Sequence, residues 1–238
     1  MTPYLDTLDH GVGDLRIGVV KEGFGSPESE PDVEAKVRDG AERLARLGAT
    51  VEEIAVPIHG VGRAIWTPTI IEGAVDLLMR GNACGTNRPG LFVNSLSEAH
   101  SRWREHADEL SVSLKLVMLV GEFVSRQYGG RFYGKSQNLI RKMREDYDRV
   151  FERYDLLLMP TTPQKATPLP ARGASAEAMF EVALNMNRNT SPFCGTGHPA
   201  ISVPCGTSDG LPIGLMLIGR HFEEAMIYRA AHAFETAS

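Results

Sequence analysis

The feature that most constrains this chain is a long helical stretch that separates two groups of strand-like segments. Short apolar runs rich in β-branched residues or leucine are typical of buried strands. They occur at residues 15–20, 51–56, 155–159, 200–203 and 213–218. Residues 60–154, in contrast, show only helical periodicity. We therefore expect an α/β fold in one domain portion covering residues 1–238, with a mixed sheet flanked by helices and an all-helical insert at about 60–154.

The first strand-like segments predict a parallel pair. Between them, residues 32–47 carry apolar side chains at helical spacing, and Gly48 follows as a capping residue. A strand–helix–strand order of this kind favours parallel strands. A sheet of about five strands would still be small, and its edges would need cover. The chain thus resembles part of something larger, or one half of a partnership.

Composition and charge exclude several classes of protein. The 238 residues are 42% hydrophobic and 23% charged, with a net charge of −5, which is ordinary for a globular protein. Nucleic acids and anionic membrane surfaces both require basic partners, so we expect neither. The longest apolar stretch, residues 114–124, contains Lys115 and Glu122 and is too short and too charged to span a bilayer.

The cysteines indicate a reducing environment. Cys84, Cys194 and Cys205 are an odd number in a long chain, which does not suggest a disulfide framework. Residues 1–15 lack the apolar run of a signal peptide. Free thiols without a signal peptide predict a cytoplasmic location.

Several local motifs suggest chemistry but have ordinary structural explanations. Residues 129–136, GGRFYGKS, fit the phosphate-binding pattern that ends in Lys135 and Ser136, yet no strand is expected before them. Cys194 and His198 could form a thiol–imidazole pair, although free cysteines are usually buried and inert. Ser111 and Lys115 would share one helical face, but an exposed face does not make a catalytic dyad.

The sequence indicates no metal site and no cofactor. None of the seven histidines pairs with a cysteine or a carboxylate at a metal-binding spacing; His100 and His106, for example, do not share a helical face.

Residues 185–200 form a dense polar segment between an expected helix at 176–187 and the strand at 200–203. The glycine and proline residues within 190–199 predict a loop there. Small polar residues beside a strand end are where α/β proteins place ligands, although an ordinary helix–strand connection is an equally good explanation.

Three segments together resemble the amidase signature family. Residues 154–163, YDLLLMPTTP, look like its strand-and-exit segment, and residues 197–204, GHPAISVP, look like its Gly-x-Pro-Ala loop. Residues 210–219, GLPIGLMLIG, resemble its Gly-Leu-Pro strand, with Met216 where glutamine is commoner. The resemblance covers nearly the whole chain. It is to the C-terminal half of the fold, and to the aliphatic and aryl amidases associated with nitrile metabolism.

The resemblance also implies what this chain lacks. Members of the family hydrolyse amides with a Ser–cis-Ser–Lys triad, whose serines lie in a Gly/Ser-rich segment. No such segment, and no match to the lysine, occurs in residues 1–238. No catalytic residue can therefore be assigned to this chain.

The substrate pocket is what the resemblance does assign. It implies an aromatic pocket wall at Trp66 and a neutral residue, Asn187, where the related glutamine-dependent amidotransferases carry an acidic one. Thr190 and the run Cys194, Gly195 and Thr196 would border the same cleft. Such a pocket would suit apolar amides rather than an ammonium-bearing substrate.

Three functional hypotheses follow. The first is an amide hydrolase in which this chain supplies the pocket, is inactive alone, and works with an N-terminal half supplied by another chain or cut from a precursor. The expected partner is that N-terminal amidase half or, in a homo-oligomer, further copies of this chain. The second is an inactive remnant that binds a ligand or a partner. The third, a nucleotide-binding module that uses Lys135, rests on the glycine-rich motif alone. We also expect the isolated chain to expose apolar surface and to self-associate.

Overall fold

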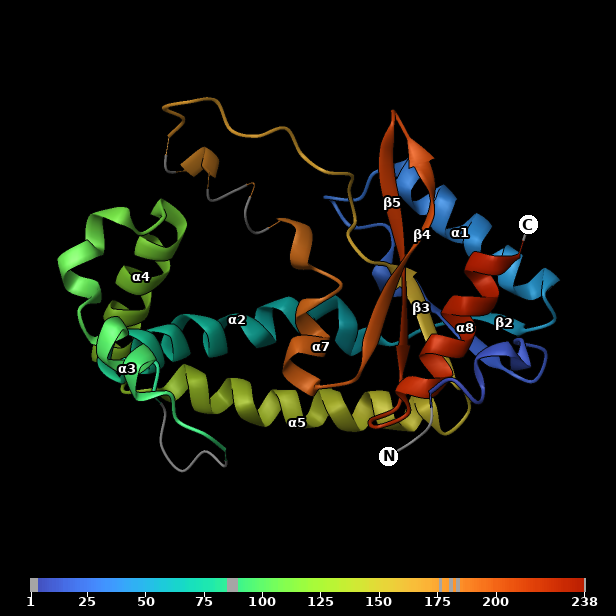
Figure 1. The fold of residues 1–238 in the computed structure, drawn as a ribbon, viewed down its shortest axis with the longest axis horizontal. Coiled ribbons are helices and arrows are strands. Elements are labelled where there is room, and N and C mark those ends of the chain that lie inside the picture. The colour runs from blue at the N-terminus through green and yellow to red at the C-terminus, as the bar shows by residue number, and fades with distance from the viewer. Residues whose placement is uncertain (1–3, 85–89, 176, 180–181, 183–184, 238) are drawn as a thin grey trace. The chain divides into compact units, whose positions relative to one another are not determined.

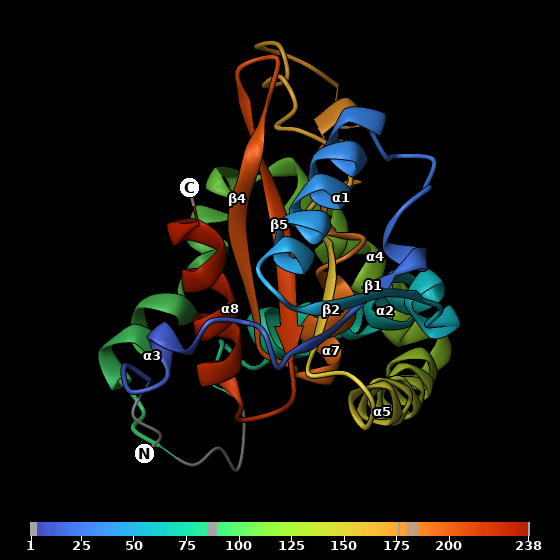
Figure 2. The ribbon, with the colours of Figure 1, turned by 90° about the vertical axis from the view of Figure 1, so that its right-hand side faces the viewer.

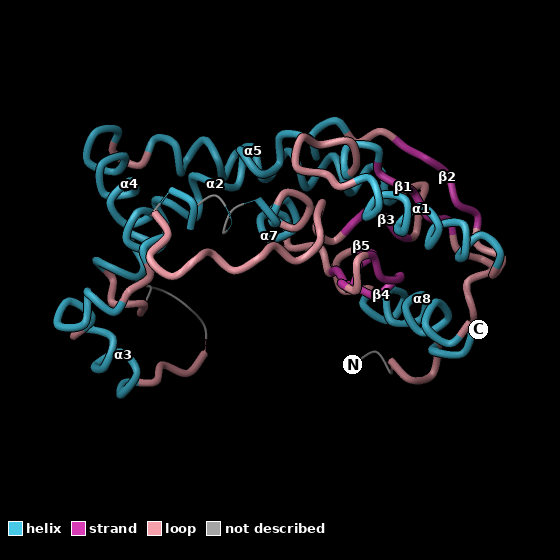
Figure 3. The backbone as a smooth tube through the Cα atoms, turned by 90° about the horizontal axis from the view of Figure 1, so that it is seen from above, coloured by secondary structure: helices cyan, strands magenta, loops and turns pink. Residues whose placement is uncertain are grey.

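A computed structural model describes residues 4–84, 90–175, 177–179, 182 and 185–237 (Figure 1). The chain forms two compact units. The first contains residues 1–63, 140–169 and 185–238, and the second contains residues 64–139 and 170–184. Among the described residues, all strands belong to the first unit (Figure 3).

The first unit is built on a mixed sheet of five strands, which confirms the expected α/β class. The strand order is β2-β1-β3-β5-β4, with β1 parallel to β2 and β3, and β5 antiparallel to β3 and β4. The strands are β1 (Arg16–Val20), β2 (Thr50–Ile54), β3 (Leu156–Pro160), β4 (Ala200–Ser208) and β5 (Leu211–Gly219).

The apolar runs of the sequence form the centre of this sheet. All five residues of β3 are buried, and so are the last four of β1, which fits strands covered on both faces. Helices α1 (Pro31–Arg46) and α8 (Glu224–Thr236) pack on one face (Figure 2). Gly40 lets α1 lie close to the sheet and to α8. A β-carbon at this position would collide with Leu215 on β5 and touch Phe234 on α8.

Strands β4 and β5 are longer than the sequence indicated and form one hairpin. Asp209 and Gly210 make its two-residue turn, with φ of 52° and 77°. Aspartate and glycine tolerate these left-handed angles, and a turn of this geometry follows the twist of antiparallel strands.

Short helical elements complete the first unit. They are η1 (Leu8–His10), η2 (Lys21–Gly23), η3 (Pro57–Val61), η6 (Asn185–Asn187) and α7 (Ser191–Thr196). The prediction of a loop over residues 190–199 was therefore wrong at α7. Pro192 lies in its first turn, where proline is pre-organised for a helix, and Gly197 ends it with φ of 81°.

The second unit is helical in its described residues. It contains η4 (Ala74–Arg80), a π-helical continuation of α2 (Gly62–Gly73), followed by α3 (Asn94–Ser101), η5 (Trp103–Glu109) and α4 (Val112–Tyr128). The unit boundaries fall within α2 and α5 (Arg131–Phe151). Helix α3 ends at Ser101, and the 3₁₀ segment η5 follows it from Trp103. The helix expected at 176–187 lies partly outside the described residues.

No helix in the described part of the chain is both long enough and apolar enough to cross a membrane.

Candidate functional site

The three segments that resemble one family become neighbouring strands. They contain β3, β4 and β5, and β5 lies between the other two. Leu158 pairs with Leu217 on one side of β5, and Ile201 pairs with Leu217 on the other. Residues distant in sequence therefore form one continuous side of the sheet.

Asn189 fixes the polar segment to the ends of two parallel strands. Its side chain is fully buried. Its Nδ2 donates to the Gly23 carbonyl at 3.0 Å and to the Pro160 carbonyl at 2.8 Å. Gly23 follows β1, and Pro160 is the last residue of β3. Since ligands of α/β proteins bind beyond the carboxyl ends of strands, the segment lies where a binding site is expected.

A buried histidine completes this anchor. His59 is 1% exposed and lies between Asn189 Oδ1, 3.3 Å from Nε2, and the Tyr147 hydroxyl, 2.7 Å from Nδ1. An amide oxygen only accepts, so Nε2 donates to Asn189 and Nδ1 accepts from Tyr147. Burial lowers the pKa of His59 to about 4, and burial likewise raises that of Tyr147. Both groups are therefore neutral at pH 7.

The predicted site residues on α7 differ in exposure. Thr190 precedes the helix and its hydroxyl donates to the Asn187 carbonyl at 3.3 Å. Cys194 is exposed and Gly195 is partly exposed, whereas Thr196 is fully buried. The Thr196 hydroxyl is 2.9 Å from His198 Nδ1. Cys194 and Gly195 are thus accessible, and Thr196 instead holds a neighbouring side chain.

The two remaining predicted site residues lie in different units. Asn187 is half-buried in the first unit, and its Oδ1 has no hydrogen-bond partner among the described residues. Trp66 is half-buried on α2, in the second unit. That all six residues line one pocket stays a prediction.

A pair of hydroxyl groups lies at the end of β3 and was not singled out by the sequence. The Thr161 and Ser202 hydroxyl oxygens are 2.6 Å apart. Gly214 makes this approach possible, because a β-carbon there would overlap the Ser202 hydroxyl. The pair lies on the exposed side of adjoining segments, and only the strand order brings it together.

His198 is held from two sides. It is 4% exposed, with Nδ1 toward Thr196 and Nε2 3.1 Å from Asp148 Oδ1 on α5. Both ring nitrogens therefore already have partners. The thiol–imidazole pair considered for Cys194 has no such support, because the exposed Cys194 is not one of those partners.

The other local motifs have structural roles in the second unit. Ser111 caps α4 by accepting from Leu114 N, and Lys115 Nζ donates to the Asp108 carbonyl. Gly129 and Gly130 form the corner between α4 and α5, so a helix precedes the glycine-rich motif where a phosphate-binding loop requires a strand. The Ser136 hydroxyl is buried and donates to the Ile65 carbonyl at 2.5 Å. The nucleotide-binding hypothesis for Lys135 lacks its required context.

A hollow of about 710 Å³ lies elsewhere in the first unit, between the segment after β2 and the end of α5. It contains none of the predicted site residues. Its lining is Ile54, Ala55, Val56, Pro57, Ile58, Asp146, Arg149, Val150, Arg153 and Tyr154.

A family model for amidases matches residues 4–228. The chain belongs to the amidase family. The sequence resemblance is thereby confirmed, and it accounts for the adjacent placement of the three matching segments.

Curated relatives of this amidase-family chain include three kinds of protein. An enantioselective amidase of Rhodococcus rhodochrous is 39% identical over 98% of the chain and 45% of its own length. An uncharacterised protein of the nthA 5′ region of Rhodococcus erythropolis is 42% identical over 72% of the chain and 86% of its own length. A glutamyl-tRNA(Gln) amidotransferase component from Exiguobacterium sibiricum is 35% identical, with 48% of its length covered.

Solved structures share the fold. A bacterial aryl acylamidase of the amidase signature family matches the whole chain with a TM-score of 0.72 at 22% identity, over 46% of its own length. A glutamyl-tRNA(Gln) amidotransferase component from Thermotoga maritima matches with a TM-score of 0.68 at 24% identity, over 44% of its length. The chain thus spans about half the length of these relatives and of the enantioselective amidase.

Proposed function

We propose that this chain is part of an amide hydrolase that converts an amide and water into a carboxylate and ammonia. The observation that carries the proposal is the family match over residues 4–228, supported by 39% identity to an enantioselective amidase across nearly the whole chain. On this proposal the nucleophile and base belong to polypeptide outside residues 1–238.

The assignment of the catalytic residues to another polypeptide follows from the absence of the catalytic segment in residues 1–238. Acyl transfer from an amide needs an activated nucleophile, a proton-transferring group and donors for the oxyanion. The Gly/Ser-rich segment that supplies these in the family has no match in the sequence. The buried histidines of the described residues do not replace it, because the imidazoles of His59 and His198 are already hydrogen-bonded to Tyr147 and Asp148. The isolated chain is therefore inactive.

The chain contributes the substrate pocket. Asn189 holds the segment of residues 187–196 beyond the ends of β1 and β3, where Cys194 and Gly195 are accessible. Asn187 is neutral, and its Oδ1 is an acceptor without a partner in the described residues, which suits a carboxamide N–H. With Trp66 as an aromatic wall, the pocket would accept apolar or aryl amides.

Complementation tests the proposal. Purified chain is mixed with a purified N-terminal half of an amidase-family enzyme, and ammonia release from an aryl amide is measured. Ammonia is expected only when both halves are present. The control is the same N-terminal half with its nucleophilic serine replaced by alanine, which should remain silent. Release by the chain alone, or silence in every combination, would contradict the proposal.

Trp66→Ala tests the pocket separately. In the complemented enzyme, the smaller side chain removes an apolar wall, so KM for aryl amides should rise several-fold while KM for small aliphatic amides changes less. Trp103→Ala, a change at the second tryptophan of the chain, is the matched control and should leave both KM values unchanged. An unchanged KM for aryl amides in Trp66→Ala would remove this residue from the pocket.

A further inference from the structure

Three side chains that share no sequence spacing meet in the first unit. Asp148 comes from α5, His198 from the segment between α7 and β4, and His221 from the turn between β5 and α8. One ligand-type atom from each lies within 4.8 Å of the other two. The two imidazole rings lie 4.2 Å apart at an interplanar angle of 33°.

His221 has a nitrogen that the protein does not satisfy. Its Nε2 is shielded from solvent and has no hydrogen-bond partner among the described residues. A buried polar atom without a partner carries a free-energy cost and needs an explanation, such as an ion that is not part of the protein. Asp148 Oδ1 and His198 Nε2 are already 3.1 Å apart, close to the spacing of two ligands on one tetrahedral zinc, given bonds of about 2.0–2.1 Å.

A hydrogen bond at Nδ1 orients the His198 ring so that Nε2 can act as a ligand. Metal-binding histidines commonly hold their other ring nitrogen in a hydrogen bond, which fixes the ring orientation and tautomer. Here the Thr196 hydroxyl, 2.9 Å from Nδ1, fixes the orientation of the ring and can either donate to or accept from that nitrogen. The Thr196 carbonyl in turn accepts from Arg144 Nε at 2.8 Å.

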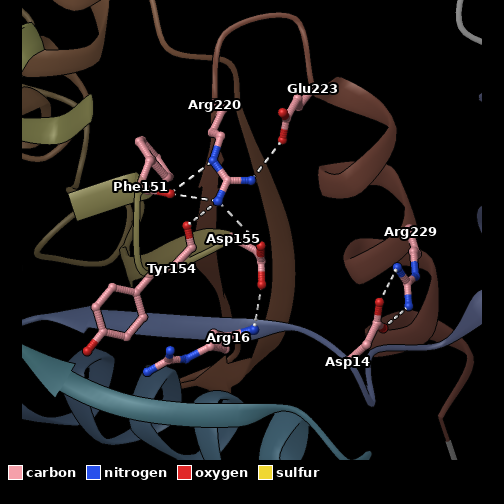
Figure 4. Close-up of polar contacts among 8 residues, drawn as sticks. All are labelled: Asp14, Arg16, Phe151, Tyr154, Asp155, Arg220, Glu223 and Arg229. Carbon is pink, nitrogen blue, oxygen red and sulfur yellow. Dashed lines mark hydrogen bonds and ion pairs between the residues drawn. The ribbon is translucent and has the colours of Figure 1, made fainter. Parts of the chain in front are cut away.

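Arg220 holds the turn that carries His221. Its guanidinium donates to the Phe151 carbonyl at 2.6 Å and to the Tyr154 carbonyl at 3.0 Å, and it contacts Asp155 and Glu223 (Figure 4). These contacts join the end of α5 to the turn after β5. His221, the next residue, is thereby kept beside the helix that presents Asp148.

We propose that Asp148, His198 and His221 form a binding site for a divalent transition-metal ion, with zinc as the preferred ion. Two imidazole nitrogens and one carboxylate oxygen suit zinc better than calcium or magnesium, which prefer oxygen ligands. His198 binds through Nε2 as the tautomer protonated on Nδ1, and this Nδ1–H donates a hydrogen bond to the Thr196 hydroxyl. His221 closes toward the other two ligands, and water fills the fourth position. The site is independent of the proposed amide hydrolysis.

Calorimetric titration of zinc chloride into the chelator-treated full chain tests the site. One zinc ion per chain is expected, and Asp148→Asn and His221→Ala should each weaken binding by more than the about 10- to 100-fold typical of losing an outer-shell partner. Cobalt(II) should give visible absorption bands in the wild type and lose them in Asp148→Asn and His221→Ala. Bound zinc should also raise the Tm of the wild type, because it binds the folded state.

The chain provides a matched control. His232 Nε2 lies 3.1 Å from Asp9 Oδ1, the same spacing as between His198 and Asp148, but this pair is exposed. His232→Ala should therefore retain full zinc affinity. Both ligand variants alter exposed or half-buried side chains, and circular dichroism verifies that they fold. Absence of zinc binding to the wild type, or equal affinity in all four proteins, would overturn the proposal.

Discussion

Buried polar side chains decide how the polar segment is held in the first unit. Asn189 uses both amide hydrogens on the ends of β1 and β3 and its oxygen on His59. The sequence indicated that residues 185–200 were important, but not that Asn189 would be the anchor rather than its neighbour Asn187. Which of several similar side chains turns inward depends on the carbonyl groups it meets, and those come from distant residues.

The cluster of Asp148, His198 and His221 was missed for a related reason. Its members come from three elements, so no local spacing could reveal it, and the sequence-based expectation of no metal site considered only nearby pairs. The Thr161–Ser202 hydroxyl pair was also invisible, because it depends on β3, β5 and β4 lying in that order.

His59 should make stability depend on pH. Its pKa is about 4 when folded and has its ordinary value of 6.5 when unfolded. Between these values the unfolded chain binds more protons, so acid favours unfolding. The contribution of His59 is complete above pH 6.5 and is lost as pH falls toward 4, by up to about 3 kcal/mol. Urea unfolding at pH 7.5 and pH 4.5 measures this loss.

His59→Gln isolates the effect. Glutamine keeps hydrogen-bonding groups near Asn189 and Tyr147 but does not titrate, so the variant should lose less stability between the two pH values than the wild type. Glu22 and Arg188, the charged groups that act on His59, remain in both proteins. His232→Gln should behave as the wild type does. An unchanged pH dependence in His59→Gln would show that His59 titrates normally.

Two of the three thiols, those of Cys194 and Cys205, should differ in reactivity. Cys194 is exposed, whereas burial raises the pKa of Cys205 to about 11. Because alkylation requires the thiolate, iodoacetamide at pH 8 should modify Cys194 well before Cys205. Mass spectrometry of peptides from a time course measures both rates, and Cys194→Ser should lose the fast phase. Faster labelling of Cys205 would contradict the packing around β4.

At the scale of elements, apolar runs were a reliable guide to the buried strands, and helical spacing of apolar residues was a reliable guide to α1. The segments that became β1, α1, β2 and β3 were all predicted within a few residues. Apart from the underestimated length of β4, the errors fall on short elements. Six-residue α7 shows too little periodicity to reveal itself, and its proline and glycine read as a loop although they mark its start and end. The break after α3 likewise has no clear sequence signal.

Gly121 should be essential for the packing of α4. A β-carbon there would overlap the Ile71 carbonyl oxygen and the Val75 side chain. Gly121→Ala should therefore destabilise the second unit by about 1 to 3 kcal/mol, the range for overpacking. Gly134 on α5 has no atom within 4 Å of its β-carbon position, so Gly134→Ala should be neutral or stabilise by up to about 1 kcal/mol. Equal urea midpoints for the two variants would contradict this arrangement.

At the scale of the whole molecule, the chain corresponds to about half the length of the enantioselective amidase and of the amidotransferase relative. It also exposes apolar side chains that a partner could cover. On α4, Val112, Leu119 and Phe123 lie on one side, and the last two are 69% and 63% exposed. Such a row on a helix is characteristic of an interaction surface. The sequence predicted this exposure in general, but not its position on α4.

We expect the isolated chain to self-associate through this side of α4. Light scattering at micromolar concentrations should give a mass above that of the 26.0 kDa monomer. Replacing Leu119 and Phe123 by serine should shift the protein toward the monomer. Leu169→Ser is the control, because Leu169 is 93% exposed but lies in the segment after β3. A monomeric wild type would exclude the association.

The position of β3 determines the order in which the sheet can assemble. β1, α1 and β2 are contiguous in sequence, and so are β4, β5 and α8, so each group can form from local contacts. β3 joins them through pairs as distant as Ile17 with Leu156. Closing so long a loop is entropically costly and slow. Pairing of β3 with β1 and β5 is therefore expected to limit the refolding rate. The β1–α1–β2 group and the β4–β5–α8 group would form first, and the central strand would join them last.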